Sequence, residues 1–470
     1  MIISPYRKEE LSLKNLENLL SKIPHVDKLM KSDIIVNSGI YRHEVTEAVR
    51  DILEQIREEL MAGKSEMIPD DAEIAQTAVE LAASRARKGV RRVINGTGVI
   101  LHSNLGRACL SEAAAKAVYE TASAYCTLEY DVGKGERGGR TECVEEYLKE
   151  ITGCQSSIIV NNNASAVLLI LFTIANGGNV VVSRGELVEI GGGFRVPDII
   201  SLCGCTLREV GTTNKTRISD YESAIDGDTK ALLKVHSSNY KIVGFTVSTA
   251  IEELSALGKS RGIPVIEDIG SGALTDVRRY GIYGEPLVRE SLKSGADIVS
   301  FSGDKLLGGP QCGIVLGDKK HIDEMRKHPL YRALRADKLT LAALEATLRV
   351  YADPRAAERE IPVLSMLSMT GDALRLCAEK LCDDIRQRGG NAEVAETKSV
   401  AGCGAVPGLE ICSYAIVPVG IVSAEETARK LRGMPVPIIG RIENDRLLLD
   451  VRTIFKEDYD YVANSIAEIT

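Results

Sequence analysis

Residues 296–317 read "ADIVSFSGDKLLGGPQCGIVLG" and carry the first strong indication of the fold class. Apolar runs at 296–301 and 312–317 predict two buried strands, and the turn between them carries Lys305, followed by a pair of glycines. A lysine normally lies on a solvated surface because its ammonium group is strongly hydrated. Two interpretations therefore stay open: an exposed lysine in a strand–turn–strand element, or a desolvated lysine held for covalent chemistry such as a Schiff base.

Upstream of this stretch, short apolar strands alternate with helical stretches. The predicted strands are "SSIIV" (156–160), "NVVVS" (179–183), "TLREV" (206–210), "ALLKVH" (231–236) and "IPVIED" (263–268). Nearly continuous apolar strands separated by helices are typical of a mainly parallel sheet covered on both faces, so the fold class is α/β. Such sheets bind ligands beyond the carboxyl ends of their strands, which is where Lys305 is expected.

The sequence predicts further domains on either side of this sheet. Apolar residues recur at three- and four-residue spacing in 11–30 and 41–60, and another helix is predicted over 71–88. After a helical stretch beyond about residue 340, "LEICSYAIVP" (409–418) and "RLLLDVRTI" (446–454) predict strands. The predicted domains are a helical N-terminal domain, a linker helix, a catalytic domain and a small α+β domain, at residues 1–65, 66–92, 93–340 and 341–470.

Composition limits the class of protein. The 470 residues carry a formal net charge of −8 and only 4% aromatic residues, which argues against a protein that coats nucleic acid, and no DNA partner is expected. The 11 cysteines show no metal-ligand spacing, so no metal site is predicted and a reducing cytoplasm is favoured. The N-terminus turns charged at once, unlike a signal peptide, and no apolar run approaches the roughly 20 residues of a membrane span. We expect a cytoplasmic protein without a membrane partner.

Asp268 is the second residue that points to chemistry. It ends the predicted strand 263–268 and precedes the turn "IGSG". A carboxylate there suits a metal ligand, a structural cap, or a partner for a cationic ring nitrogen. A pyridoxal phosphate enzyme needs a lysine to hold the aldehyde of the cofactor and an acid to keep its ring nitrogen charged. Asp268 lies about one strand–helix–strand unit before Lys305, and this arrangement resembles that of the aspartate-aminotransferase-like superfamily.

A third feature fits the phosphate of such a cofactor. "VNNNASAVLL" (160–169) runs from a strand through small polar residues into a helix, whose first N–H groups attract a dianion. Asn162, Asn163 and Ala164 stand at this helix start, although asparagine turns also serve simply as caps. The resemblance to the superfamily adds Ser302, which stands where many of its members place a phosphate-binding hydroxyl.

Longer motifs resemble one family within this superfamily. These are "RRVINGTGVILHSNLGRACLSEAA" (91–114), "VNNNASAV" (160–167), "GTTNKT" (211–216), "KVHSSNYKIVGF" (234–245), "EDIGSG" (267–272), "SGDKLLGGPQ" (302–311) and, near the N-terminus, "IPHVDKLM" (23–30). Together they are similar to the bacterial selenocysteine synthases, the L-seryl-tRNA(Sec) selenium transferases, which are fold type I pyridoxal phosphate enzymes. The resemblance covers nearly the whole chain; Gly96 and Ser103 stand where alanine and threonine are common.

The resemblance implies a reaction. Lys305 would carry pyridoxal phosphate and act as the base at the Cα of L-seryl-tRNA(Sec). Loss of the serine hydroxyl would leave an aminoacrylyl ester, and selenophosphate would deliver selenium to give L-selenocysteinyl-tRNA(Sec). Asp304, next to the lysine, would tune its charge or bind a neighbour; a plain surface acid is the alternative.

Further residues follow from the same resemblance. Arg107, Arg332 and Arg335 match arginines of the selenium-donor site, and a helix would place the last two on one face. His236 and Asn239 are candidates to contact the cofactor ring or its phenolic oxygen; a buried histidine with satisfied hydrogen bonds is the alternative for His236. Thr212 and Thr213 match a pair in the family without a role assigned here. The tRNA would bind the N-terminal domain or "RARKGVRR" (85–92), and the family assembles as a homodecamer, a ring of dimers.

Two alternatives stay open. A related pyridoxal phosphate lyase acting on a small amino acid or an amino sugar phosphate would use the same lysine and aspartate. Such a lyase would not need the helical N-terminal domain. A non-catalytic tRNA-binding scaffold is the alternative of another class, and the presence of Lys305, Asp268 and Ser302 argues against it.

Overall fold

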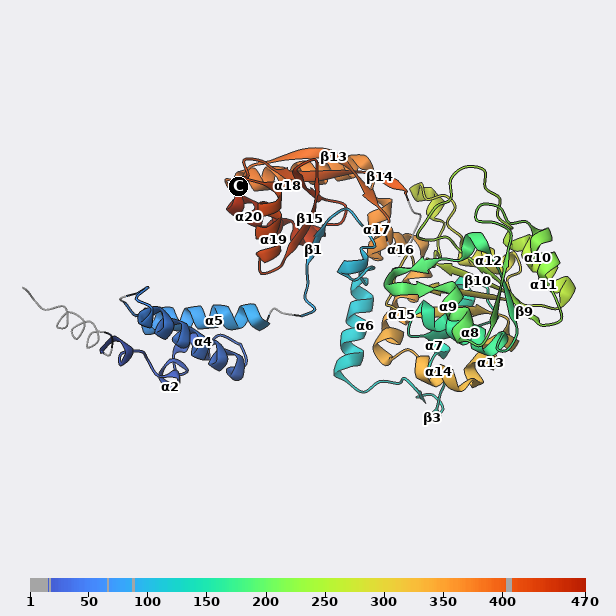
Figure 1. Cartoon of the computed structure of the whole chain (residues 1–470), viewed down its shortest axis with the longest axis horizontal. Coiled ribbons are helices and arrows are strands. Elements are labelled where there is room, and N and C mark those ends of the chain that lie inside the picture. The colour runs from blue at the N-terminus through green and yellow to red at the C-terminus, as the bar shows by residue number, and fades with distance from the viewer. Residues whose placement is uncertain (1–15, 17, 66, 87–88, 403–407) are drawn as a thin grey trace, which may run out of the picture. The chain divides into compact units, whose positions relative to one another are not determined.

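The computed structural model describes residues 16, 18–65, 67–86, 89–402 and 408–470. The chain divides into two compact units, residues 1–92 and 93–470, and each is described by itself (Figure 1). Parts of the predicted helices 11–30 and 71–88, and part of "RARKGVRR", lie outside the described residues.

The first unit is helical. Its described helices are α2 (Val26–Leu29), α3 (Asp33–Val36), α4 (Arg42–Met61) and α5 (Asp71–Ala86). The apolar residues of α4, which recur at three- and four-residue spacing, lie on its buried face: Val45, Ala48, Val49, Leu53, Ile56 and Leu60. Together with α5 they form a hydrophobic core belonging to this unit alone.

The second unit is built on a seven-stranded sheet with the order β4-β12-β11-β10-β9-β5-β8. The strands are β4 (Ser156–Val160), β5 (Asn179–Ser183), β8 (Thr206–Val210), β9 (Thr229–Val235), β10 (Val265–Gly270), β11 (Ile298–Ser302) and β12 (Gly313–Gly317). Only β12 runs antiparallel to its neighbours β4 and β11 within this sheet. The prediction of a mainly parallel α/β sheet is therefore confirmed.

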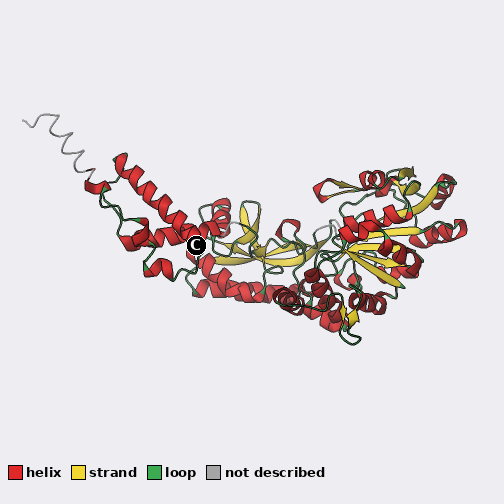
Figure 2. Ribbon diagram, turned by 90° about the horizontal axis from the view of Figure 1, so that it is seen from below, coloured by secondary structure: helices red, strands yellow, loops and turns green. Residues whose placement is uncertain are grey.

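Helices cover both faces of this sheet (Figure 2). Successive strand residues alternate between the faces, so Ile159 lies in one core and its neighbours Ile158 and Val160 in the other. One face packs against α7 (Glu142–Thr152), α10 (Ile218–Ala224), α11 (Ile251–Arg261), α12 (Val288–Lys293) and α15 (Lys338–Tyr351). The other packs against α8 (Asn163–Ile174), α9 (Val196–Leu202) and α13 (Lys319–Lys327). This double cover explains why strands such as β5 and β11 are buried along their whole length.

Shorter elements complete this part of the unit. They are α6 (Glu112–Ser123), α14 (Pro329–Leu334), α16 (Pro354–Glu360), α17 (Pro362–Ser368) and the hairpins β2 (Tyr130–Asp131) with β3 (Glu136–Arg137) and β6 (Glu189–Ile190) with β7 (Phe194–Arg195). Helix α6 packs on α15, and α16 and α17 extend the same core.

A second sheet of five strands has the order β1-β15-β16-β14-β13. Its strands are β1 (Ile94–Gly96), β13 (Ala392–Val400), β14 (Glu410–Pro418), β15 (Ile438–Glu443) and β16 (Arg446–Asp450), packed with α18 (Gly371–Gln387), α19 (Ala424–Gly433) and α20 (Tyr459–Ile469). Strand β1 pairs in parallel with β15, although the two are far apart in sequence. The second unit therefore starts in this sheet, builds the larger one and returns. No helix among the described residues is long and apolar enough to cross a membrane.

Candidate functional site

A cavity of about 380 Å³ lies beyond the carboxyl ends of β10 and β11. It brings together most of the predicted site residues: Arg107, Asn162, Asn163, Ala164, Asn239, Asp268, Ser302, Asp304 and Lys305. Residues that the sequence did not lead us to propose for the site also line it: Ser103, Ile190, Gly191, Phe194, Ser238, Gly270, Gln311 and Cys312. The glycine run "GGG" at 191–193 was a signal for a close-approach loop that could have been used.

Lys305 is buried, with only 6% of its surface exposed. Its loop is held by backbone hydrogen bonds, among them Leu306 N to Ser271 O (3.0 Å) and Gly308 N to Lys305 O (2.9 Å). A Cβ on Gly272 would lie 2.6 Å from Cδ2 of Phe301, so the turn after β10 can pack against β11 only with glycine there. The interpretation as an exposed turn lysine is therefore wrong.

Asp268 lies on β10 and is 4% exposed. Asn163 Nδ2 donates a hydrogen bond of 2.8 Å to its Oδ1, and Ser300 Oγ donates one of 3.2 Å to the same atom. Burial raises the pKa of Asp268, and the hydrogen bond from Asn163 and the charge of Lys305 oppose that rise only partly. The carboxylate is thus placed where a cationic N–H group would stabilise it.

The start of α8 forms one wall of the cavity. Asn162 is its N-cap residue, and its side chain accepts a hydrogen bond of 2.8 Å from Ser165 N. The capping role left open by the sequence is therefore real, while Asn163 and Ala164 occupy the first turn, whose N–H groups favour an anion. Asn163 Oδ1 is buried and has no hydrogen-bond partner among the described residues.

Arg107 and Asp304 form an ion pair at this cavity. Arg107 Nη1 lies 2.7 Å from Asp304 Oδ2, and Ala108 N donates to Asp304 O at 3.3 Å. Arg107 has a positive φ of 65°, a conformation that non-glycine residues rarely adopt outside constrained sites. Asp304, only 5% exposed, binds this neighbour and is not a surface acid.

The two residues predicted to contact the cofactor ring, Asn239 and His236, line different cavities. Asn239 lines the cavity and donates from Nδ2 to Glu189 O at 2.8 Å. The imidazole of His236 instead lines a second cavity of about 570 Å³, where its Nε2 is 3.5 Å from Glu285 Oε2. Thr213 lines this second cavity too, while Thr212 bonds to Lys215 in the adjacent turn. His236 is therefore not among the residues that line the Lys305 cavity.

The predicted arginine pair is not on one helical face. Arg332 lies within α14, but Arg335 is its C-cap residue with extended backbone (φ −60°, ψ 143°) and bridges to Val160 of β4. Arg335 Nη1 is 3.8 Å from Glu129 Oε1. Neither arginine lines the Lys305 cavity of its own chain. The prediction that Arg332 and Arg335 share one helical face is wrong, because α14 ends at Leu334, one residue before Arg335.

No group of three or more His, Cys, Asp or Glu side chains in the described part of the chain is arranged to hold a metal ion. The chemistry available at the cavity is thus that of a buried lysine, a buried carboxylate and an anion-favouring helix start, with an arginine at the wall. This is the donor set that a phosphorylated, aldehyde-bearing aromatic cofactor requires.

Comparisons with known proteins agree with one another. The family model described as "SelA: L-seryl-tRNA selenium transferase" matches residues 93–455. The L-seryl-tRNA(Sec) selenium transferase of Geobacter sulfurreducens is 47% identical over 460 residues, covering 96% of this chain and 99% of the relative. That of Alkaliphilus oremlandii is 44% identical, covering 97% and 99%.

A solved structure also shares the fold. The D-glucosaminate-6-phosphate ammonia-lyase matches with a TM-score of 0.56 at 20% identity, over 82% of this chain and 97% of that one. The chain therefore belongs to the L-seryl-tRNA selenium transferase family.

Proposed function

We propose that this chain converts L-seryl-tRNA(Sec) to L-selenocysteinyl-tRNA(Sec) with selenophosphate as donor, and that pyridoxal phosphate bound at Lys305 serves the reaction. Membership of the family supports the overall reaction. The observation that carries the assignment of the site is that two buried ionisable side chains, Lys305 and Asp268, line one cavity at the carboxyl edge of the sheet.

The residues at the cavity fit this cofactor. Lys305 would hold its aldehyde, and Asp268, whose raised pKa reflects a carboxylate that burial destabilises, would pair with the ring N–H. The start of α8 and the hydroxyl of Ser302 would hold the phosphate. The bound cofactor supplies a ring that stabilises negative charge at the Cα of the seryl group.

The chain itself supplies proton transfer and orientation. Lys305 Nζ is the base for the Cα proton, since its amine is buried and lines the cavity. Asp268 keeps the proton on the ring nitrogen, and Asn163 fixes the direction of its carboxylate. Both groups are buried, so little solvent reaches the lysine amine or the carboxylate.

Selenophosphate needs cations at the same cavity. Arg107, held by Asp304, brings a guanidinium group to the wall, and such a group binds phosphate oxygens in pairs. Arg332 and Arg335 remain predicted contacts of the selenium donor, selenophosphate. Because they lie outside the cavity of their own chain, such contacts require them to face the cavity of another copy. We propose that the chain forms a homo-oligomer, a decamer arranged as a ring of dimers.

We further propose that residues 1–65 bind tRNA and that 66–92 link them to a catalytic domain (93–340) and a small domain (341–470) in a cytoplasmic enzyme. The hydrophobic core that α4 shares with α5, a helix of the 66–92 segment, supports a separate N-terminal module that includes this segment. Membership of the family favours selenium transfer over a small-substrate lyase or a scaffold.

The test is an assay with seryl-tRNA(Sec), selenophosphate and the holoenzyme, in which the amino acid on the tRNA is identified by mass spectrometry. Selenocysteine in the presence of wild-type protein, and unchanged serine with Lys305→Ala, is the expected result. Serine alone with the wild-type holoenzyme would overturn the proposal. Seryl-tRNA(Ser) serves as the control for the tRNA.

A further inference from the structure

The segment that carries Arg107 into the active site begins in the other sheet of the same unit. After β1, Gly98 N donates to Thr453 Oγ1 at 3.1 Å, and Gly98 O accepts from Val400 N at 3.0 Å. Ile100 N and Leu101 N then donate to the carbonyl oxygens of Val400 (3.1 Å) and Ala401 (2.8 Å). The backbone of residues 97–101 is therefore bonded along its length to the C-terminal part of the unit.

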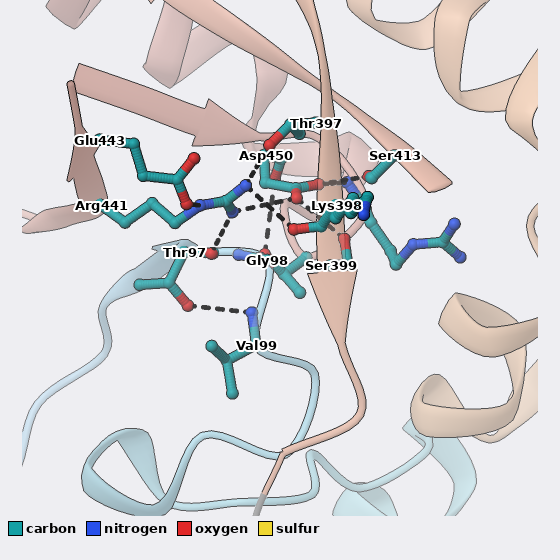
Figure 3. A network of polar contacts seen from close by, with 12 residues as sticks. Thr97, Gly98, Val99, Thr397, Lys398, Ser399, Ser413, Arg441, Glu443 and Asp450 are labelled. Atoms are coloured by element: carbon teal, nitrogen blue, oxygen red, sulfur yellow. Dashed lines mark hydrogen bonds and ion pairs between the residues drawn. The ribbon is translucent and has the colours of Figure 1, made fainter. Parts of the chain in front are cut away.

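A buried polar network holds the start of this segment (Figure 3). Asp450 is completely buried and accepts hydrogen bonds from Ser399 Oγ (2.8 Å) and Ser413 Oγ (2.6 Å). Arg441 lies against it, with Nη1 3.2 Å from Asp450 Oδ2, and the same guanidinium donates to the backbone oxygen of Thr97. Asp450 thereby orients Arg441, and Arg441 holds the segment.

Gly98 lies in close contact with the Arg441–Asp450 ion pair. Its φ is +75°, and a Cβ placed on it would lie 2.8 Å from Asp450 Cγ and 2.5 Å from Arg441 Nη1. Both values are below normal van der Waals contact, so the main chain passes directly over the ion pair and leaves no room for a side chain. The network and the segment form one packed unit.

The same segment ends at the Lys305 loop. Leu101 is completely buried in the core of the larger sheet, and Arg107 N donates to His102 O at 3.0 Å. Arg107 then adopts its positive φ of 65° and pairs with Asp304. Few free dihedral angles therefore separate the Arg441 contact from the Arg107 guanidinium.

We propose that Arg441 and Asp450 are positioning residues that set the place of Arg107 in the active site from the smaller sheet. Neither lines the Lys305 cavity, so they act through residues 97–107. That Arg107 contacts the selenium donor rests on the proposed function; that Arg441 orders its segment does not.

The experiment compares Arg441→Gln with Arg446→Gln in the full-length holoenzyme. Arg446 is a matched control because it also pairs across the smaller sheet, with Glu393, but at an exposed site. Arg441→Gln is expected to speed amide hydrogen exchange in peptides covering 97–108 at least about tenfold, because it frees this segment locally. It should also raise the KM for selenophosphate about tenfold at nearly unchanged kcat, the sign of lost binding shared by ground and transition states. Arg446→Gln should change neither quantity.

A double-mutant cycle tests whether Arg441 acts through Arg107. Arg107→Ala combined with Arg441→Gln should be no worse in KM than Arg107→Ala alone, because the positioned group is already absent. Additive losses would overturn the proposal, as would unchanged exchange in 97–108.

Thr453→Val is the second variant, since it removes the acceptor of Gly98 N without breaking the Arg441–Asp450 pair. Thr453→Val should show the same faster exchange in 97–108 and the same rise in the KM for selenophosphate, so it tests the proposal even if Arg441→Gln does not fold. Wild-type exchange and KM in this variant would contradict the proposal. An inactive wild-type enzyme with faster exchange in the variants would overturn the proposed function while leaving the positioning intact.

Discussion

Arg107 Nη1 lies 2.7 Å from Asp304 Oδ2, in the residue directly before Lys305. The pair joins a segment that starts in the smaller sheet to the loop that carries the lysine. The carboxylate is almost completely buried, so its charge is balanced mainly by this arginine. The pair thus fixes a cation and a lysine in one geometry.

Replacing Asp304 by Asn should therefore weaken use of the donor. The amide removes the charge that holds Arg107, and we expect the KM for selenophosphate to rise about tenfold with the cofactor still bound. Steady-state kinetics and the visible absorption of the bound cofactor measure the two effects. Asp276→Asn, which alters an exposed pair with Arg278, is the control. An unchanged donor KM in the Asp304 variant would show that the pair has no part in donor binding.

Asp268→Asn should slow the removal of the Cα proton. A neutral amide cannot keep the ring nitrogen charged, so we expect a loss of at least about 100-fold in single-turnover proton exchange with solvent deuterium. Cofactor content should stay near that of the wild type, because Lys305 and the helix start remain. Exchange at the wild-type rate would contradict the role of Asp268.

The same residue predicts a pH dependence of stability in the cofactor-free protein. Because burial raises the pKa of Asp268 above its unfolded value of 3.8, its contribution to stability is complete below that value and is lost as pH rises through the folded pKa. The melting temperature of Asp268→Asn relative to wild type should therefore increase as pH rises above about 4.

Asp226 provides a control of opposite sign. Its pKa is lowered, first by the hydrogen bond from Thr229, so its contribution to stability is present above the unfolded pKa and is lost as pH falls. Asp226→Asn should accordingly become less stable relative to wild type as pH rises from about 3 to 6. If both variants shifted in the same direction, the assignment of the buried carboxyl would be wrong.

Removing residues 1–92 should weaken binding of seryl-tRNA(Sec) and leave the cofactor absorption unchanged. The reason is that residues 1–92 form a unit with its own core and contribute no residue to the cavity. Filter binding and absorption spectra measure the two properties.

Arg332→Ala and Arg335→Ala should affect selenium transfer and not tRNA binding. They should keep tRNA affinity, since tRNA spreads its phosphates over a large surface, but impair selenium incorporation. A truncated protein with wild-type tRNA affinity, or arginine variants that lose tRNA binding, would contradict this division.

Much of the larger sheet follows from local sequence. Runs such as "SSIIV" and "NVVVS" are buried on both faces, and their apolar continuity marks the strands at 156–160 and 179–183 to the residue. Lys305 and Asp268 could be paired because Asp268 ends one predicted strand and Lys305 follows another strand of the same mainly parallel sheet.

Other features depend on long-range packing. Strand β1 has only three residues, "ING", and exists because it pairs with β15 near the other end of the chain. His236 stands just after β9, where the alternation of strand side chains no longer fixes direction, and it turns toward Glu285. Arg335 leaves its helix because its backbone bridges to Val160. None of these partners is visible in the neighbouring sequence.

The assignment of Lys305 is tested most directly by identifying which residue carries the cofactor. Borohydride reduction of the holoenzyme, followed by proteolysis and mass spectrometry, fixes the cofactor to the lysine that holds it. We predict a pyridoxyl group on Lys305 and loss of the visible absorption band. The same group on a different lysine, or on none, would contradict the account.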